Sequence, residues 1–76
     1  MPHIVVKMHS GRSEAQKHEI AEEVTRAIMK SAKSSEASIS VGIEDIDPAD
    51  WDAKVFEPEI AGKAHTLYKK PGYKDV

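Results

Sequence analysis

Apolar residues near the start of the chain recur at every second position. Ile4, Val6 and Met8 occupy alternate positions, which would share one face of a strand, and Val5 adds an apolar side chain on the other face. A period of two is typical of a β-strand, and apolar residues of both parities indicate that both faces of the strand are partly covered. The pattern predicts a strand over residues 2–8.

The period then changes to that of a helix. Ser13 and Gln16 stand three residues apart, as the two partners of a capping box do at the start of a helix. The apolar positions that follow are spaced by i, i+4, i+7 and i+8, and they are Ile20, Val24, Ala27 and Ile28. This spacing places them on one face, so we predict an amphipathic helix that ends near Ala32.

Alternation of apolar with small or polar residues returns over residues 38–44, which predicts a second strand. A strand, a long helix and a strand form a βαβ unit with parallel strands and a right-handed crossover. Two strands alone do not make a stable sheet, and one helix covers only one face. We therefore expect an α/β (α+β) fold whose sheet is completed by a second copy of the chain.

The last third of the chain has helical signals interrupted by proline. Asp47 followed by Pro48 is a helix start, which predicts a short helical turn to about Phe56. Beyond Pro58 the apolar residues again have helical spacing, and they are Ile60, Ala64, Leu67 and Tyr68. We expect a C-terminal helix over residues 58–69, weakened by a glycine at position 62. No repeat or linker divides the chain, so residues 1–76 are interpreted as one domain.

Composition narrows the possible partners. The chain has 76 residues, no cysteine and four histidines without metal-ligand spacing, so neither disulfides nor a metal would stabilise this small domain, and oligomerisation remains. A net charge of -2 gives no reason to expect a nucleic-acid partner. The longest apolar run, residues 4–6, is far below the roughly 20 residues of a membrane span, and no signal peptide is evident. We expect a soluble, cytoplasmic protein with no membrane partner.

Pro2 is the first residue that suggests chemistry. Cells usually remove a methionine that precedes a small residue, which would leave Pro2 with a free secondary amine. An α-amino group has an ordinary pKa of about 7.7 to 8.0, and burial or a nearby cation lowers it. A rigid amine that is neutral near pH 7 is a good general base. Without further context, Pro2 would be interpreted as an ordinary residue at the start of a strand.

A longer pattern supplies that context. A proline-led strand is followed by Gly11-Arg12-Ser13-Glu14-Ala15-Gln16-Lys17, and then by a helix that contains Glu23-Val24-Thr25-Arg26-Ala27-Ile28. This arrangement resembles the 4-oxalocrotonate tautomerase family, and the similarity continues through the second strand to Trp51. The tail, Lys69-Lys70-Pro71-Gly72-Tyr73, is most similar to the dimeric phenylenolpyruvate tautomerase branch.

The resemblance implies roles for three residues. Pro2 would be the catalytic base, Arg12 would bind a substrate carboxylate beside it, and Trp51 would form an aromatic wall that excludes water. Arg12 could otherwise be a solvated loop residue, although a cation is unfavourable beside the positive end of a helix. Trp51 could equally be ordinary core. The resemblance implies no cofactor and no metal.

Ser40 departs from the family pattern, because the resemblance implies a second arginine at this position, supplied by a neighbouring subunit. A diacid would lose one carboxylate partner, so a monocarboxylate such as phenylenolpyruvate becomes the expected substrate. Ser40 could still offer its hydroxyl to the enol oxygen, or it could be only an outward-facing polar residue.

The resulting expectation is a cofactor-independent keto–enol tautomerase, an isomerase that acts on a 2-hydroxy-2-enoate or 2-keto acid as a homodimer or a higher oligomer. Two alternatives stay open. One is a dehalogenase or decarboxylase of the same superfamily that uses protonated Pro2 as a general acid. The other is a non-catalytic βαβ dimer that binds a small acid or a protein, which a retained Met1 would favour.

Overall fold

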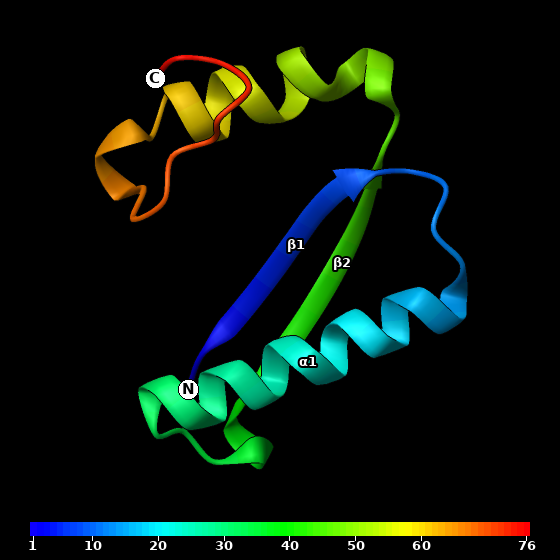
Figure 1. Cartoon of the computed structure of the whole chain (residues 1–76), viewed down its shortest axis with the longest axis vertical. Helices are drawn as coiled ribbons and strands as arrows, with labels where there is room; N and C mark the ends of the chain where they lie inside the picture. The colour runs from blue at the N-terminus through cyan, green and yellow to red at the C-terminus, as the bar shows by residue number, and fades with distance from the viewer. The chain divides into compact units, whose positions relative to one another are not determined.

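The first half of the chain forms the predicted strand–helix–strand unit. A computed structural model describes all 76 residues, in two compact units, Met1–Asp45 and Ile46–Val76. In the first, strand β1 (His3–His9) leads to helix α1 (Glu14–Ala32) and, after a 3₁₀ turn at Glu36–Ser38, to strand β2 (Ser40–Ile46). The two strands run parallel in a two-stranded sheet, and α1 crosses one face of it (Figure 1). The expected βαβ fold is confirmed.

One hydrogen bond sets the register of the two strands. The Ser40 amide donates to the Pro2 carbonyl oxygen at 3.2 Å, which in a parallel pair places Ser40 beside His3. Side chains alternate between faces, so the helix-free face carries the neighbours His3 and Ser40, and further along Val5 and Gly42. The opposite face carries the apolar residues of both strands toward α1, and these are Ile4, Val6, Met8, Val41 and Ile43.

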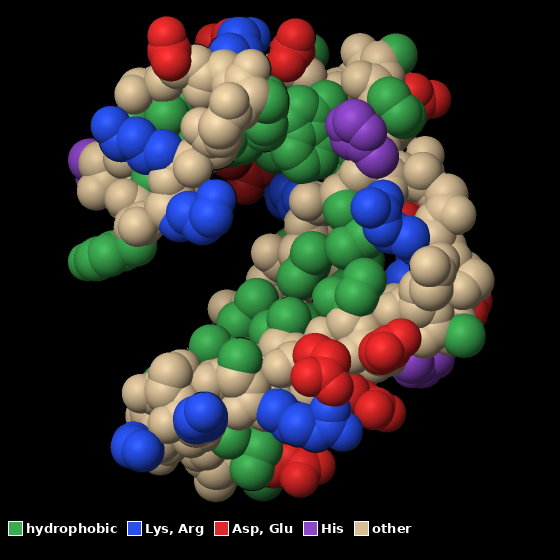
Figure 2. Space-filling model, in the orientation of Figure 1, with side chains coloured by type: hydrophobic (Ala, Val, Ile, Leu, Met, Phe, Trp, Pro, Cys, Tyr) green, Lys and Arg blue, Asp and Glu red, His purple; other side chains and the backbone are tan.

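The first unit has little core of its own. None of the residues of α1 is buried, and the apolar residues of both strands are at best half-buried. Val5, on the helix-free face, is 42% exposed. Figure 2 shows hydrophobic side chains gathered along the strand pair, in a diagonal band across the middle of the view. A single chain therefore leaves apolar sheet surface in water, where it gains none of the free energy of burial.

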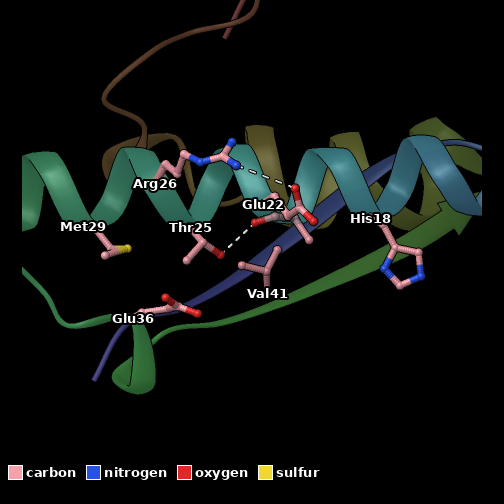
Figure 3. Close-up of a pocket in the computed structure, with 8 residues that line it drawn as sticks. His18, Glu22, Thr25, Arg26, Met29, Glu36 and Val41 are labelled. Atoms are coloured by element: carbon pink, nitrogen blue, oxygen red, sulfur yellow. Dashed lines mark hydrogen bonds and ion pairs between the residues drawn. The ribbon is translucent and has the colours of Figure 1, made fainter.

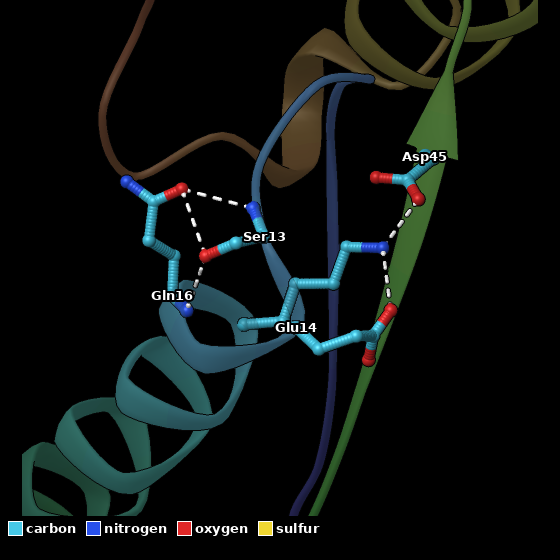
Figure 4. A network of polar contacts seen from close by, with 5 residues as sticks. Ser13, Glu14, Gln16 and Asp45 are labelled. Atoms are coloured by element: carbon cyan, nitrogen blue, oxygen red, sulfur yellow. Dashed lines mark hydrogen bonds and ion pairs between the residues drawn. The ribbon is translucent and has the colours of Figure 1, made fainter.

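The start of α1 is held by polar contacts (Figure 4). Ser13 and Gln16 form the predicted capping box. The backbone N–H of Gln16 donates to Ser13 Oγ at 3.2 Å, and the backbone N–H of Ser13 donates to Gln16 Oε1 at 2.9 Å. In the next turn, Lys17 Nζ lies 2.5 Å from Asp45 Oδ2 and 3.5 Å from Glu14 Oε1. The hydrogen bond to Asp45 raises the pKa of Lys17. These contacts tie the first turns of α1 to the end of β2.

The second unit begins as the sequence predicts. Asp47 Oδ1 accepts a hydrogen bond from the Ala49 amide at 2.9 Å, and Pro48 opens a 3₁₀ turn, Pro48–Asp50. A π-helical segment, Asp52–Ala61, follows directly and includes Pro58. The sequence predicted that Pro58 would separate two helices, and this was wrong. Proline obstructs an α-helix because its ring meets the carbonyl four residues earlier, whereas π-helical hydrogen bonds span five residues.

The predicted helix to Lys69 was also wrong in extent. The π-helical segment ends at Ala61. The backbone amide of its C-cap, Gly62, donates to the Glu57 carbonyl oxygen at 2.8 Å, and only a 3₁₀ turn, Ala64–Thr66, comes after it. Tyr68, which helical spacing assigned to an apolar face, is 105% exposed. A Cβ at position 62 would lie 2.7 Å from the Pro58 carbonyl oxygen, so this helix end requires glycine.

The core of the second unit lies beneath the C-terminal tail. Val55 and Phe56 are the buried hydrophobic residues of the structure, at 5% and 3% exposure. The tail folds back over them: the ring centroid of Tyr73 is 6.1 Å from that of Phe56, and Lys74 Nζ lies 4.2 Å from the centroid of Phe56. Aromatic pairing and a cation–π contact therefore hold the tail against the π-helical segment.

Neither α1 nor any other helix of the structure has the length and apolar content that crossing a membrane requires.

We predict that Gly62→Ala destabilises the protein by about 1–3 kcal/mol, because the new methyl group would overlap backbone carbonyl oxygens. Those oxygens, of Pro58 and Glu57, would lie 2.7 and 2.8 Å from the added Cβ. Denaturant unfolding measures the change. Gly72→Ala is the matched control, since its Cβ would meet nothing within 4 Å, and it should not lower stability. Equal stability of both variants would contradict the close approach.

We predict that Lys17→Met lowers the melting temperature and that the loss depends on Asp45. The pKa of Lys17 is raised from its ordinary value of 10.5, so its stabilising effect is complete below the unfolded-state pKa and disappears as the pH rises through the folded-state pKa. A double-mutant cycle of Lys17→Met and Asp45→Asn measures the coupling. It should be clear at neutral pH and vanish in strong alkali; additive effects at neutral pH would refute the ion pair.

Candidate active site

Arg12 is positioned by the turn between β1 and α1. Gly11 has a φ of 122°, a conformation that side chains rarely tolerate, and this glycine lets the chain leave β1 and enter the helix. The exposed Arg12 side chain donates from Nη1 to the carbonyl oxygen of His9 at 3.1 Å. A guanidinium has five N–H donors, so this bond leaves others for a ligand. Arg12 is thus a cation at the C-terminal end of β1.

The other members of the Gly11–Lys17 stretch have structural roles. Ser13 and Gln16 cap α1, and Lys17 pairs with Asp45. None of these contacts needs a substrate. Arg12 is therefore the side chain of the stretch that is available for chemistry.

Pro2 lies at the opposite end of the strand. It is half-buried at the entrance to β1, and its carbonyl oxygen accepts the Ser40 amide hydrogen at 3.2 Å. Met1, in contrast, is 103% exposed, so an aminopeptidase can reach it without unfolding the chain. Removal of Met1 would leave a ring nitrogen on a residue whose position β2 already fixes.

Pro2 and Arg12 do not meet within one chain. They flank the seven residues of β1, and Figure 1 shows the N-terminus at one end of that strand and the loop to α1 at the other. A strand of that length spans roughly 23 Å, which is far beyond the reach of an arginine side chain. The structure thus brings Pro2 together with Ser40 and separates both from Arg12.

His3 lies at the Pro2 end of the sheet, although the resemblance did not single it out as a site residue. Its Nδ1 lies 2.6 Å from Ser40 Oγ, and both side chains are exposed. Alternation along the chain puts the side chain of His3 on the other face from that of its neighbour Pro2. What the sequence did not reveal was the strand register, which puts Ser40 on that same face.

Trp51 belongs to the second unit, just before the π-helical segment. It is half-buried, and its indole Nε1–H donates to the Tyr73 hydroxyl at 3.0 Å. The indole N–H therefore already has a protein partner. Trp51 can therefore offer its apolar rings, and not its N–H group, as a wall toward a substrate.

A groove runs between α1 and β2, with a volume of about 540 Å³ (Figure 3). Thr25 and Met29 of α1 point to the side on which Val41 and Glu36 lie. None of the four predicted site residues, Pro2, Arg12, Ser40 and Trp51, lines it. Its most basic group, Arg26, is already paired with Glu22 and Glu23. The groove is therefore separate from the predicted chemistry.

No group of three or more histidine, aspartate or glutamate side chains converges in a way that could hold a metal ion. The predicted site residues offer hydrogen-bond donors, namely the Ser40 hydroxyl near Pro2 and the Arg12 guanidinium at the far end of β1.

Comparisons with known proteins identify the family of this chain. A family model described as "Tautomerase enzyme" matches residues 2–57. "Tautomerase PptA" of Cronobacter sakazakii is 42% identical over 74 residues, covering 96% of this chain and 97% of that protein. A "Probable tautomerase" of Xylella fastidiosa is 37% identical over 73 residues, covering 96% of this chain and 89% of that protein.

Among solved structures, YwhB, titled a homologue of 4-oxalocrotonate tautomerase, superposes with a TM-score of 0.59 at 39% identity. The match covers 60% of this chain and 75% of that one. The family match and the near-complete coverage of the relatives give one conclusion: the chain belongs to the tautomerase family, and it is an isomerase that acts on a small molecule.

Proposed function

We propose that the protein is a cofactor-independent keto–enol tautomerase that uses the amine of Pro2 as its general base. The observation that carries this proposal is the setting of Pro2: half-buried, fixed to β2 through its carbonyl oxygen, and preceded by a fully exposed Met1. Once Met1 is removed, the ring nitrogen becomes a rigid secondary amine. A positioned base of this kind contributes to proton transfer without first having to be ordered.

The reaction moves one proton and leaves the amine unchanged. Neutral Pro2 takes the hydroxyl proton of the enol, and the electrons of that O–H bond form the carbonyl. The electrons of the carbon–carbon double bond then take the proton from Pro2 at the adjacent carbon, which gives the 2-keto acid. A cation near Pro2 favours this cycle, because it lowers the pKa of the amine and balances the substrate carboxylate.

We infer that this cation is the Arg12 of a second copy of the chain. Within one chain the length of β1 separates Arg12 from Pro2. If two copies associate with their β1 strands antiparallel, the Pro2 end of each lies near the Arg12 end of the other. The exposed apolar surface of the strand pair supports such an association, since a partner would bury it. The proposed enzyme is a homodimer whose every site uses both chains.

The substrate class follows from the number of cations. Arg12 provides one guanidinium, and Ser40 provides a neutral hydroxyl where a second carboxylate would need positive charge. We propose a 2-hydroxy-2-enoate with a single carboxylate and an aromatic or apolar tail, such as phenylenolpyruvate. The rings of Trp51 would form an apolar wall of the site, and the two units together would act as one domain over residues 1–76, as the near-complete coverage of the relatives supports.

Pro2→Ala should reduce kcat for phenylenolpyruvate by about a hundredfold, because it replaces a rigid secondary amine with a mobile primary one. The ultraviolet absorbance of the enol measures turnover, and intact mass spectrometry verifies that both proteins lack Met1. In the wild type, kcat/KM should fall on the acid side as Pro2 becomes protonated. Full turnover by Pro2→Ala would remove Pro2 from the mechanism. An increase of the wild-type kcat/KM at acid pH would favour general-acid chemistry instead.

Mixing two inactive variants tests the shared site. In a dimer of one Pro2→Ala chain and one Arg12→Ala chain, one site carries both changes and the other carries neither. After random subunit exchange, about a quarter of wild-type activity should return. If Pro2 and Arg12 act within one chain, every site stays defective and the mixture remains as inactive as its components. A mixture of each variant with itself, treated identically, is the control.

A further inference from the structure

The helix-free face of the sheet carries a polar pair at its Pro2 end that sequence analysis did not assign. His3 Nδ1 lies 2.6 Å from Ser40 Oγ, and the Ser40 amide donates to the carbonyl oxygen of Pro2 at 3.2 Å. Pro2, His3 and Ser40 are thus joined by two hydrogen bonds across neighbouring strands. The backbone of Ser40 is thus within hydrogen-bond distance of the backbone of Pro2.

Stability does not account for the pair. Both side chains are exposed, and water competes for both of their polar groups. An intramolecular hydrogen bond in such a place contributes little net free energy to folding. Other neutral polar residues at these two positions would serve the sheet equally well.

The direction of the hydrogen bond decides what Ser40 can do. A serine hydroxyl has one proton and two acceptor lone pairs. If His3 Nδ1 accepts that proton, the hydroxyl presents only lone pairs to a ligand and repels a negatively charged oxygen. If Nδ1–H donates to Oγ, the hydroxyl proton is free to point at the ligand, and the donation from His3 strengthens it as a donor.

We propose that His3 is a positioning residue, which donates from Nδ1–H to Ser40 Oγ so that the hydroxyl of Ser40 donates to the enol oxygen of the substrate. This inference rests on the proposed tautomerase function and assigns the donor for the atom that loses its proton. As Pro2 removes the proton, negative charge grows on that oxygen, and a donor already aimed at it stabilises the transition state more than the ground state.

This relay, from His3 Nδ1 to Ser40 Oγ and on to the substrate oxygen, also affects which substrates the site accepts. A serine hydroxyl and an imidazole stand where the family pattern has a guanidinium, so the site gains a hydrogen-bond donor in place of a permanent positive charge. Such a donor suits an enol or keto oxygen and gives little help to a second carboxylate, which would lose its hydration without a counter-charge. The His3–Ser40 pair therefore favours substrates with one carboxylate.

Kinetics of matched variants test the relay. His3→Leu should lower kcat about tenfold, less than the loss of a fully buried oxyanion donor because this site is exposed, and should leave KM nearly unchanged. His3→Asn should retain most of the activity, because its amide nitrogen can occupy the place of Nδ1. Ser40→Ala should match His3→Leu, and the double variant should be no worse than either. His65→Leu, an exposed histidine elsewhere, is the control and should be unaffected.

Wild-type kcat in His3→Leu, or multiplicative losses in the double variant, would overturn the relay. An independent measurement separates this result from a failure of the proposed function. Nitrogen NMR of the His3 ring is recorded with phenylpyruvate added to the protein that lacks Met1. It should show a proton on Nδ1 in the wild type and no such fixed proton in Ser40→Ala. That result supports the relay even if the protein turns over no enol, whereas an unprotonated, accepting Nδ1 refutes it even in an active enzyme.

Discussion

The length of strand β1 is the constraint on which the rest of the site depends. A parallel strand–helix–strand unit must carry the chain from one end of the sheet back to the other before the second strand can begin. Pro2 precedes β1 and Arg12 lies in the turn that follows it, so the two residues are always a full strand apart. No change of side-chain conformation can close that gap within one chain.

The same geometry links folding to activity. The strand–helix–strand unit has no buried residue in α1 and leaves apolar surface on the strands in water, while the second unit has its own small core around Val55 and Phe56. An association that covers the sheet would add stability where a single chain lacks it and would also complete the proposed site. In such a protein, substitutions at the interface affect both properties together.

The sequence predicted the regions in which local chemistry decides the structure. Alternation identified both strands, the Ser13–Gln16 pair identified the start of α1, and Asp47 with Pro48 identified the next helical turn. The sequence did not predict the structure where contacts between distant residues, or unusual backbone hydrogen bonds, determine it. Pro58 was expected to end a helix, but five-residue hydrogen bonds accommodate it, and the pairing of His3 with Ser40 depends on a strand register that alternation alone does not fix. Trp51 was identified, but its partner Tyr73 lies in the tail, 22 residues away in sequence.

The contact between Trp51 and Tyr73 has a practical consequence. The chain contains a single tryptophan, and its indole is attached through one hydrogen bond to the segment that folds back over Phe56. Its intrinsic fluorescence is consequently an optical signal from one known place, without any added label. Undocking of the last few residues would expose that indole to water and shift its emission to longer wavelengths, so the protein carries its own spectroscopic reporter of the state of its tail.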